Sequence, residues 1–189
     1  MFTTFRGGNS GAWQVISQQP VKGEALAQVP CLSVIHSDAI ALPLIPSQTS
    51  WRLAGVASHV RYTERTEKEQ LASVQARLGR PEATCAALIP VKKSAAWWEL
   101  TQEERRQIFE DKSHHIAASL KYLPAIARQL YHSRDLGEPF DFLTWFEYEP
   151  AQTEAFEELV GTLRATEEWN YVDREVDIRV ERERLDAHD

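Results

Sequence analysis

Four stretches in the second half of the chain carry the apolar patterns of β-strands. Residues 83–91 form a short apolar run typical of a buried strand, and residues 125–132 alternate between apolar and polar positions. Residues 140–149 are rich in aromatic side chains, which favour strands. Residues 169–181 also alternate, and their apolar face comprises Val172, Val176, Ile178 and Val180. These patterns predict four strands.

Two helical patterns separate these strands. Residues 100–123 predict one long helix, in which Thr101 and Glu104 form a capping box. Pro124 ends this helix, because the residue before a proline is disfavoured in the helical conformation. A second helix is predicted at residues 151–167, with apolar side chains at helical spacing at Phe156, Leu159, Val160 and Leu163. The order of the second half is therefore β-α-β-β-α-β, the pattern of a ferredoxin-like unit.

The first half of the chain predicts a truncated, related unit. Residues 12–16 and 51–62 favour strands and residues 63–79 a helix, whereas the apolar stretch at residues 29–49 is interrupted by three prolines and predicts only poorly defined strands. We therefore expect an α+β fold in two parts, residues 1–83 and residues 84–189. Two such sheets pack face to face or close into a barrel, and we expect a barrel-like core.

Composition and charge narrow the classes of partner. The 189 residues carry a net charge of −7, and the basic residues gather on no single stretch, which argues against nucleic acid. No apolar run approaches the length of a membrane span, and the first residues lack an apolar signal core. Cys31 and Cys85 lie far apart, without metal-ligand spacing. We expect a cytoplasmic protein that binds neither nucleic acid nor membrane.

Two residues that could bind a ligand, His115 and Arg128, lie on either side of Pro124. On one continuous helix, His115 and Arg128 would lie about 20 Å apart and could not share a small ligand. If the helix ends at Pro124, Arg128 moves onto a strand, on one face with Ile126 and Leu130. A helix and a strand packed together can hold a flat ligand between His115 and Arg128. From the residues alone, a structural histidine is the commoner alternative.

Gln75 and the pair Lys93 and Trp97 are further polar anomalies. Gln75 lies within the apolar stripe of its predicted helix, where a buried amide needs a partner. It either bonds to backbone or lines a pocket and holds another polar group. Lys93 precedes Trp97 by four residues, so a cation and an indole donor could share one anion. The alternative for Trp97 and its neighbour Trp98 is a core and a surface edge.

Five segments, taken in order, resemble the chlorite dismutase family of heme b proteins. They are RYTERTEKEQL, IPVKKSAAWWEL, SHHIAASLKYLPAIARQLYH, DFLTWFE and EEWNYVDREVDIRV. The resemblance covers residues 51–182. It implies two ferredoxin-like halves in each subunit, with heme b in the C-terminal half. The compact N-terminal part resembles the short clade of the family and implies a homodimer.

The resemblance also implies roles for individual residues. His115 resembles the proximal ligand of the heme iron and Arg128 the distal catalytic arginine, with Gln75 meeting its guanidinium. Glu168 resembles the carboxylate that accepts a hydrogen bond from the ligand histidine, and its neighbour Glu167 is the alternative. Other residues complete the expected site: Lys93, Trp97 and Tyr62 at the heme propionates, Trp98 packed nearby, and Leu130, Thr144 and Phe146 lining the distal pocket.

Two positions distinguish the chemistries found within the family. The coproheme decarboxylase branch has a tyrosine where this chain has Ile89, and usually a glutamine where it has Arg128. Both differences favour conversion of chlorite to chloride and dioxygen, through an oxoferryl intermediate and transient hypochlorite. The expected ligands are chlorite and small anions. The alternatives are coproheme decarboxylation, a heme-binding or heme-transfer protein, and a dimerisation domain without a cofactor.

Overall fold

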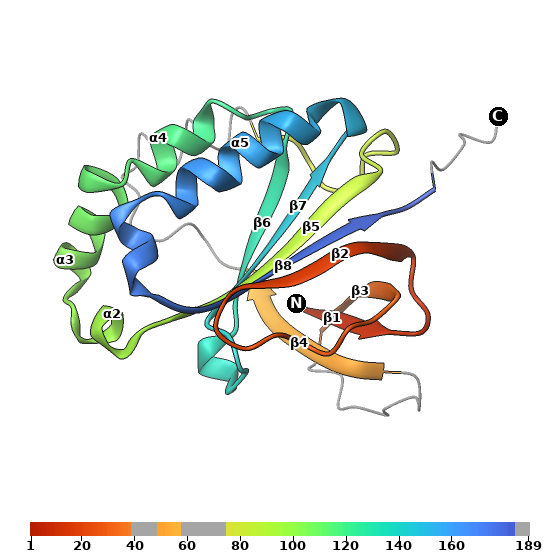
Figure 1. The fold of residues 1–189 in the computed structure, drawn as a ribbon, viewed down its shortest axis with the longest axis horizontal. Helices are drawn as coiled ribbons and strands as arrows, with labels where there is room; N and C mark the ends of the chain where they lie inside the picture. The colour runs from red at the N-terminus through yellow and green to blue at the C-terminus, as the bar shows by residue number, and fades with distance from the viewer. Residues whose placement is uncertain (39–48, 58–74, 184–189) are drawn as a thin grey trace.

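The computed structural model describes residues 1–38, 49–57 and 75–183, and in this part eight antiparallel strands close into a barrel (Figure 1). The first half supplies β1 (Phe2–Gly8), β2 (Trp13–Lys22), β3 (Cys31–Ser37) and β4 (Thr49–Ala57). The second half supplies β5 (Cys85–Lys93), β6 (Ala127–His132), β7 (Phe142–Tyr148) and β8 (Val172–Glu181). Their order around the barrel is β1-β3-β2-β8-β5-β7-β6-β4. Closure pairs every strand with two neighbours, although β4 and β6 pair at only two positions.

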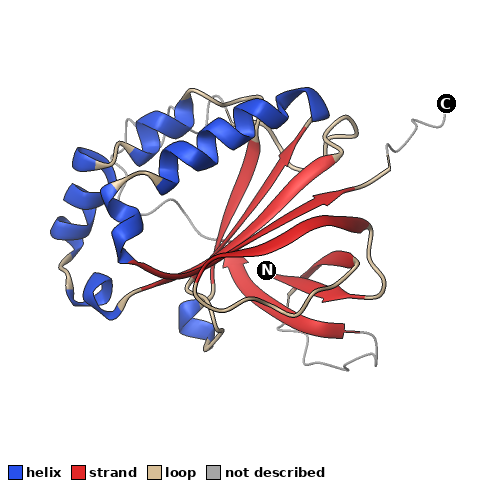
Figure 2. Cartoon of the chain, in the orientation of Figure 1, coloured by secondary structure: helices blue, strands red, loops and turns tan. Residues whose placement is uncertain are grey.

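Helices cover the outer face of the strands from the second half (Figure 2). The α-helices are α2 (Ala95–Glu99), α3 (Gln102–Arg106), α4 (His115–Leu120) and α5 (Thr153–Arg164). A π-helical turn, η1 (Gln107–Lys112), joins α3 to the turn before α4. Short 3-10 turns are η2 (Arg134–Leu136), η3 (Pro150–Gln152) and η4 (Glu167–Tyr171). Within the described residues, no helix is both long and apolar enough to cross a lipid bilayer.

The barrel strands of the second half are buried on both faces. Leu88, Trp145 and Ile178 belong to a core that fills the barrel interior. Phe146 and Phe156 belong to a second core, between the outer face of the sheet and α5. A strand covered on both sides favours apolar residues on both faces, which explains the apolar run at the start of β5.

The predicted α+β class and the β-α-β-β-α-β order of the second half are confirmed. The expected barrel forms because β8 of the second half pairs with β2 and β6 pairs with β4, so that both halves share one sheet. The division at residues 83 and 84 remains a prediction. The strand β1 was not predicted, because its threonines interrupt the apolar pattern.

The prediction of one long helix at residues 100–123 is wrong. The capping box of Thr101 and Glu104 is present. However, α3 continues into the π-helical turn, and His114 then takes the left-handed conformation, with a φ of 49°. A new helix begins at His115, where the Glu110 carboxylate accepts the Ile116 backbone N–H at 2.6 Å. No proline or glycine marks this break. The helical segment does end before Pro124, as predicted, since α4 stops at Leu120.

The predicted helix at residues 63–79 falls largely outside the described residues. Of this stretch, residues 75–79 are described, and they form neither helix nor strand. They lie instead against β6, through Gln75 and the Arg128 carbonyl, and against β7, where the Gly79 backbone N–H donates to Oε2 of Glu147. The strand predicted at residues 51–62 is present as β4, and its residues 58–62 lie outside the described part.

Candidate functional site

His115 and Glu168 are in direct contact, although they lie on different elements. The Nδ1 atom of His115, at the start of α4, is 2.8 Å from Oε2 of Glu168 in η4. The backbone N–H of Glu168 donates to the Ser113 hydroxyl at 3.2 Å, which fixes η4 against the turn before α4. The alternative carboxylate, Glu167, instead pairs with Lys112 at 3.0 Å near the surface. Of the two neighbours, Glu168 is therefore the partner of the histidine.

Lys93 occupies the second oxygen of the same carboxylate. Its Nζ donates to Oε1 of Glu168 at 2.7 Å, and the residue is only 5% exposed. The ammonium also lies 4.6 Å from the ring centroid of Trp97 and 5.3 Å from that of Trp169. The structure thus shows Lys93 paired with Glu168, and its expected contact with a heme propionate stays a prediction.

The charges of this group fix the protonation of the histidine ring. Burial raises the pKa of Glu168, but the charges and hydrogen bonds of Lys93 and His115 outweigh it and hold the pKa at about 2. An ionised carboxylate can only accept hydrogen bonds, so Nδ1 of His115 carries the proton. The lone pair of the ring is then on Nε2, which is the atom available to bind a metal.

The His115 ring is held in place without blocking Nε2. It stacks on Phe109 with the ring centroids 4.3 Å apart, and its side chain is 15% exposed. In the described part of the chain, Nε2 has no hydrogen-bond partner. The same part contains no group of three or more His, Cys, Asp or Glu side chains that could hold a metal. One oriented histidine suits an iron whose other ligands come from a macrocycle, rather than a metal held by protein alone.

Arg128 lies on β6, on the face of the sheet that α4 covers. Its strand neighbours across β7 are Phe146, opposite Arg128 itself, and Thr144, opposite Leu130. Burial lowers the pKa of the Arg128 guanidinium. Among the described residues no carboxylate pairs with it, so this cation is held in a largely apolar setting. A guanidinium remains charged even there, and an anion is the ligand that it lacks.

Ser119 links the histidine to the arginine. Its hydroxyl donates to the His115 carbonyl one turn earlier in α4, at 2.7 Å. Nη1 of Arg128 donates to the same hydroxyl, at a long 3.5 Å. Ser119 thus connects the backbone of His115, at the start of α4, to the side chain of Arg128 on β6. That His115 and Arg128 face one ligand stays a prediction. Ser119 was not among the predicted site residues, although its position four residues after His115 was the available signal.

Gln75 contacts the backbone of Arg128 and not its guanidinium. Its Nε2 donates to the Arg128 carbonyl at 2.5 Å, while Nη2 of Arg80 donates to the Ala125 carbonyl at 3.0 Å. The expected side-chain contact is corrected, and the backbone alternative holds. The physical reason is the edge of β6, which pairs with β4 only at Tyr131 and His132 and leaves its earlier carbonyls open.

The remaining predicted residues divide into two groups. Leu130, Thr144 and Phe146 share the Arg128 face, and Ile89 of β5 joins them because it pairs with Thr144. Trp97 is 1% exposed and packs on Tyr171 with centroids 5.6 Å apart. These aromatic contacts indicate a core position for Trp97.

Trp98 lies apart from the His115 and Arg128 pair. Its Nε1 donates to Asp141 Oδ2 at 3.3 Å, and the Arg134 guanidinium lies 3.7 Å from its ring centroid. This is the surface edge that was the alternative for the second of two adjacent tryptophans. Tyr62, the other residue expected at a propionate, lies outside the described residues.

Comparison with known proteins gives a consistent result. A family model described as chlorite dismutase matches residues 45–183. A dimeric chlorite dismutase from Nitrobacter winogradskyi has a solved structure that is 66% identical, covers 95% of this chain and 99% of its own, and has a TM-score of 0.88. A chlorite dismutase variant from Candidatus Nitrospira defluvii, solved with cyanide, is 21% identical, with coverage of 94% and 90% and a TM-score of 0.69, and shows the fold alone.

A curated relative matches a shorter stretch. The chlorite dismutase of Ideonella dechloratans is 45% identical over 62 residues, which is 33% of this chain and 20% of that relative. The longer matches, by contrast, span both halves of the barrel and include His115, Arg128 and Glu168. The chain belongs to the chlorite dismutase family.

Proposed function

We propose that this protein is a heme b-dependent chlorite dismutase, which converts one chlorite ion to chloride and dioxygen. The observation that carries the proposal is the pair His115, at the start of α4, and Arg128, on β6, which Ser119 of α4 connects. His115 is oriented by an ionised carboxylate, and Arg128 is a half-buried cation that pairs with no carboxylate among the described residues. The solved relative that is 66% identical is a chlorite dismutase, which supports the same activity here.

The residues fit heme b. Nε2 of His115 makes no hydrogen bond with the described residues, while Nδ1 is bonded to Glu168. The face that carries Arg128 also presents Leu130 and Phe146, which are apolar as a porphyrin requires. When bound, heme supplies a redox-active iron that exchanges an oxygen atom with the chlorine oxyanion. The propionate contacts stay a prediction, with Lys93, Tyr62 and Trp97 as the candidates.

On the proximal side, this chain controls the basicity of the ligand nitrogen. The Glu168 anion attracts the Nδ1 proton of His115 and so increases electron density at Nε2. Lys93 keeps this arrangement intact, because it holds Oε1 of Glu168 while Oε2 faces the histidine. A more basic ligand favours the more oxidised states of a heme iron. The Lys93, Glu168 and His115 group is therefore proposed to set the reduction potential.

On the distal side, Arg128 binds the oxyanion. A guanidinium presents several donors in one plane and suits chlorite as well as the hypochlorite released from it. Leu130 and Phe146 exclude water from this face, which strengthens the charge contact. Gln75 holds the Arg128 backbone in place through its carbonyl. Retention of hypochlorite until dioxygen forms is the proposed task of Arg128.

Coproheme decarboxylation is the second candidate function. A decarboxylase of this family carries a catalytic tyrosine at the position of Ile89. This position lies on the face of the sheet that carries Arg128, because Ile89 pairs with Thr144 beside Leu130. An aliphatic side chain there has no phenol to oxidise, so the observation favours chlorite chemistry. A heme carrier is the third candidate, and it has no need of a desolvated distal cation.

One experiment separates these functions. The protein is reconstituted with heme b, the Soret band is recorded, and oxygen release is followed with an electrode after chlorite is added. Rapid oxygen release with an equal amount of chloride supports the proposal. A Soret band without oxygen favours the carrier, or the decarboxylase if coproheme and peroxide give product. Absence of a Soret band rejects all three and leaves His115 a structural residue.

The assembly and the compartment are also proposals. A homodimer is supported by the Nitrobacter winogradskyi relative, which is described as dimeric. Light scattering after size-exclusion chromatography tests it, and the monomer mass of 21.6 kDa is the outcome that contradicts it. A cytoplasmic location is supported by the two cysteines, Cys31 and Cys85, which are both free thiols.

A further inference from the structure

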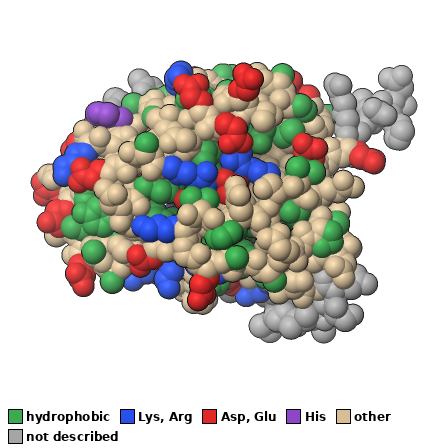
Figure 3. Space-filling model, in the orientation of Figure 1, with side chains coloured by type: hydrophobic (Ala, Val, Ile, Leu, Met, Phe, Trp, Pro, Cys, Tyr) green, Lys and Arg blue, Asp and Glu red, His purple; other side chains and the backbone are tan. Residues whose placement is uncertain are grey.

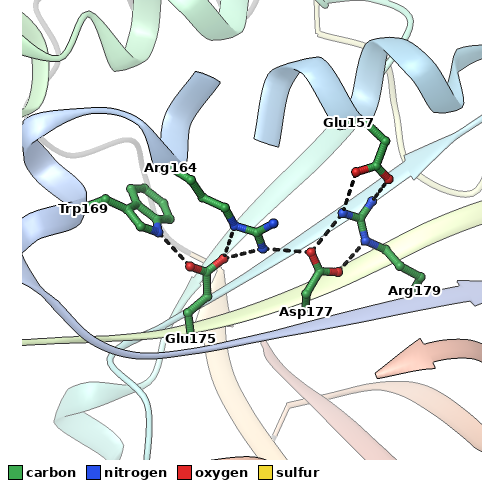
Figure 4. A network of polar contacts seen from close by, with 6 residues as sticks. All are labelled: Glu157, Arg164, Trp169, Glu175, Asp177 and Arg179. Atoms are coloured by element: carbon green, nitrogen blue, oxygen red, sulfur yellow. Dashed lines mark hydrogen bonds and ion pairs between the residues drawn. The ribbon is translucent and has the colours of Figure 1, made fainter. Parts of the chain in front are cut away.

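Five charged residues form a ladder between β8 and α5, largely away from solvent. Most charged side chains of the protein lie at its surface, where Figure 3 shows acidic and basic groups interspersed. The ladder differs because Glu175 is 0% and Asp177 is 2% exposed. On β8, Val176 and Ile178 fill the barrel interior. The alternate positions Glu175, Asp177 and Arg179 therefore face α5 on the outer side of the sheet (Figure 4).

Each rung of the ladder pairs opposite charges. Arg164 of α5 donates to Oε1 of Glu175 through Nε at 2.8 Å and Nη2 at 2.6 Å, and to Asp177 at 2.8 Å. Arg179 pairs with Asp177 and, at 2.8 Å, with Glu157. The order is Glu175, Arg164, Asp177, Arg179 and Glu157, with three negative and two positive charges. The ladder thus has one excess negative charge.

One end of the ladder reaches Trp169, the residue that follows Glu168. The Nε1–H of Trp169 donates to Oε2 of Glu175 at 2.7 Å, so both oxygens of this buried carboxylate are occupied. Figure 4 shows the indole pointing at Glu175 from the turn that carries Glu168. Glu175 therefore holds η4 in place through Trp169, the residue next to Glu168, which contacts His115.

The face of the same indole lies near Lys93. The Lys93 Nζ is 5.3 Å from the Trp169 ring centroid and donates to Glu168. A hydrogen bond from an indole N–H to a carboxylate makes the ring more electron-rich, and hydrogen-bonded groups polarise one another in this way. A more electron-rich ring attracts a cation more strongly. The Glu175 charge is thereby transmitted through Trp169 to the cation that orients Glu168.

We propose that Glu175 and Trp169 are positioning residues for the proximal side of the site. They hold Glu168 against His115 and so keep the reduction potential of the bound iron low. The inference rests on the proposed heme function, but its structural part concerns contacts within the chain itself. Glu175 touches neither His115 nor any ligand, and it acts through Trp169, Lys93 and Glu168.

The first test measures the reduction potential of the reconstituted protein by spectroelectrochemistry. Trp169→Phe and Glu175→Gln should both shift the potential upward, in the same direction as Glu168→Gln and by less. The double variant should shift it no further than the larger single variant, since both act on one path. Glu157→Gln is the matched control at the other end of the ladder, where the side chain is 56% exposed, and it should leave the potential unchanged.

Two results would overturn the proposal. One is a parent-like potential in folded Trp169→Phe, and the other is an equal shift in Glu157→Gln. If Glu175→Gln does not fold, Trp169→Phe decides alone, because it keeps all five charges of the ladder.

A second test needs no heme. Urea unfolding midpoints of the apoprotein are measured for the parent, for Glu168→Gln, for Trp169→Phe and for the variant that combines these two substitutions. Coupling through Lys93 predicts that the double variant loses less than the two single losses combined. Additive losses contradict the proposal even if heme binds. If no Soret band forms, the proposed function fails, while this cycle still decides whether Trp169 positions Glu168.

Discussion

Nδ1 of His115 lies 2.8 Å from Oε2 of Glu168, although 53 positions separate the two residues along the chain. The contact forms because α4 begins at His115, directly after His114, whose backbone has the left-handed conformation. The η4 turn then brings Glu168 against the start of α4, where its backbone N–H meets Ser113. Orientation of the histidine thus depends on a break in a helix and on a distant turn.

Replacement of Glu168 by glutamine should raise the reduction potential of the reconstituted protein. Glutamine keeps the shape but carries no charge, so it attracts the Nδ1 proton less and leaves Nε2 a weaker donor to the iron. Spectroelectrochemical titration measures the change. Glu167→Gln is the matched control, because Glu167 pairs with Lys112 at the surface and should have little effect. An unchanged potential in Glu168→Gln would mean that the wrong carboxylate has been identified.

The same carboxylate predicts a pH dependence of stability in the apoprotein. The pKa of Glu168 is lowered from 4.5 to about 2, because Lys93 and His115 outweigh the opposing effect of burial. A carboxyl whose folded pKa is depressed stabilises the protein fully above its unfolded pKa, and the stabilisation is lost as pH falls through the folded pKa. The window therefore runs from pH 4.5 down to about 2. Its size is on the order of 3 kcal/mol, at about 1.4 kcal/mol for each pKa unit.

Urea unfolding of the parent and of Glu168→Gln at several pH values checks this window. The difference between their free energies of unfolding should be constant near neutral pH and shrink below pH 4.5. Glu167→Gln should follow the pH dependence of the parent throughout. A difference that does not change between pH 6 and the acid limit of folding, about pH 3 for many domains, would contradict the assigned pKa.

Replacement of Arg128 by alanine should leave heme binding intact and weaken retention of hypochlorite. The Arg128 guanidinium donates to the Ser119 hydroxyl, whereas the His115 ring is bonded to Glu168, so loss of the guanidinium does not disturb the proposed iron ligand. Turnover should fall by up to roughly 10²-fold, the usual cost of one lost oxyanion donor. A chlorination trap added during turnover should capture more hypochlorite than with the parent, and the variant should inactivate sooner.

Arg128→Lys is the companion variant, because it keeps the charge and loses the planar set of donors. It should trap an intermediate amount of hypochlorite. Equal trapping by the parent, Arg128→Lys and Arg128→Ala would remove the proposed role of Arg128 in holding the anion.

The sequence was sufficient where the pattern has one physical cause. Trp145 and Phe146 fall on opposite faces of β7, and both faces are buried, so the aromatic run predicted the strand correctly. Pro124 also separates His115 from Arg128 as expected, since α4 ends before it and β6 follows it. A local rule, the geometry of proline, was enough to predict that the two residues lie on different elements, and a ligand shared by them stays a prediction.

The sequence was insufficient where tertiary contacts decide. The break at His114 depends on the Glu110 side chain, which bonds to backbone N–H groups of the next helix instead of facing solvent. Lys93 and Glu168 are 75 positions apart, and periodicity does not indicate that a buried cation pairs with that carboxylate. Likewise, the ladder at Glu175 was not foreseen, because alternation on β8 predicts which residues share a face but not that this face is buried.

Gln75 provides the last test, because it acts on the backbone of Arg128 and not on its charge. Gln75→Ala leaves the Arg128 carbonyl without its donor at the open edge of β6, which should cost about 1–3 kcal/mol in the free energy of unfolding. The strand should then shift more freely, and hypochlorite trapping should rise to a level between the parent and Arg128→Ala. Gln129→Ala is the matched control on the same strand, since its amide donates to the adjacent Leu130 carbonyl. Lower stability with parent-like trapping in Gln75→Ala would mean that Gln75 only stabilises the fold. Higher trapping in Gln75→Ala, but not in Gln129→Ala, would show that the backbone of Arg128 must be held in place for the anion to be retained.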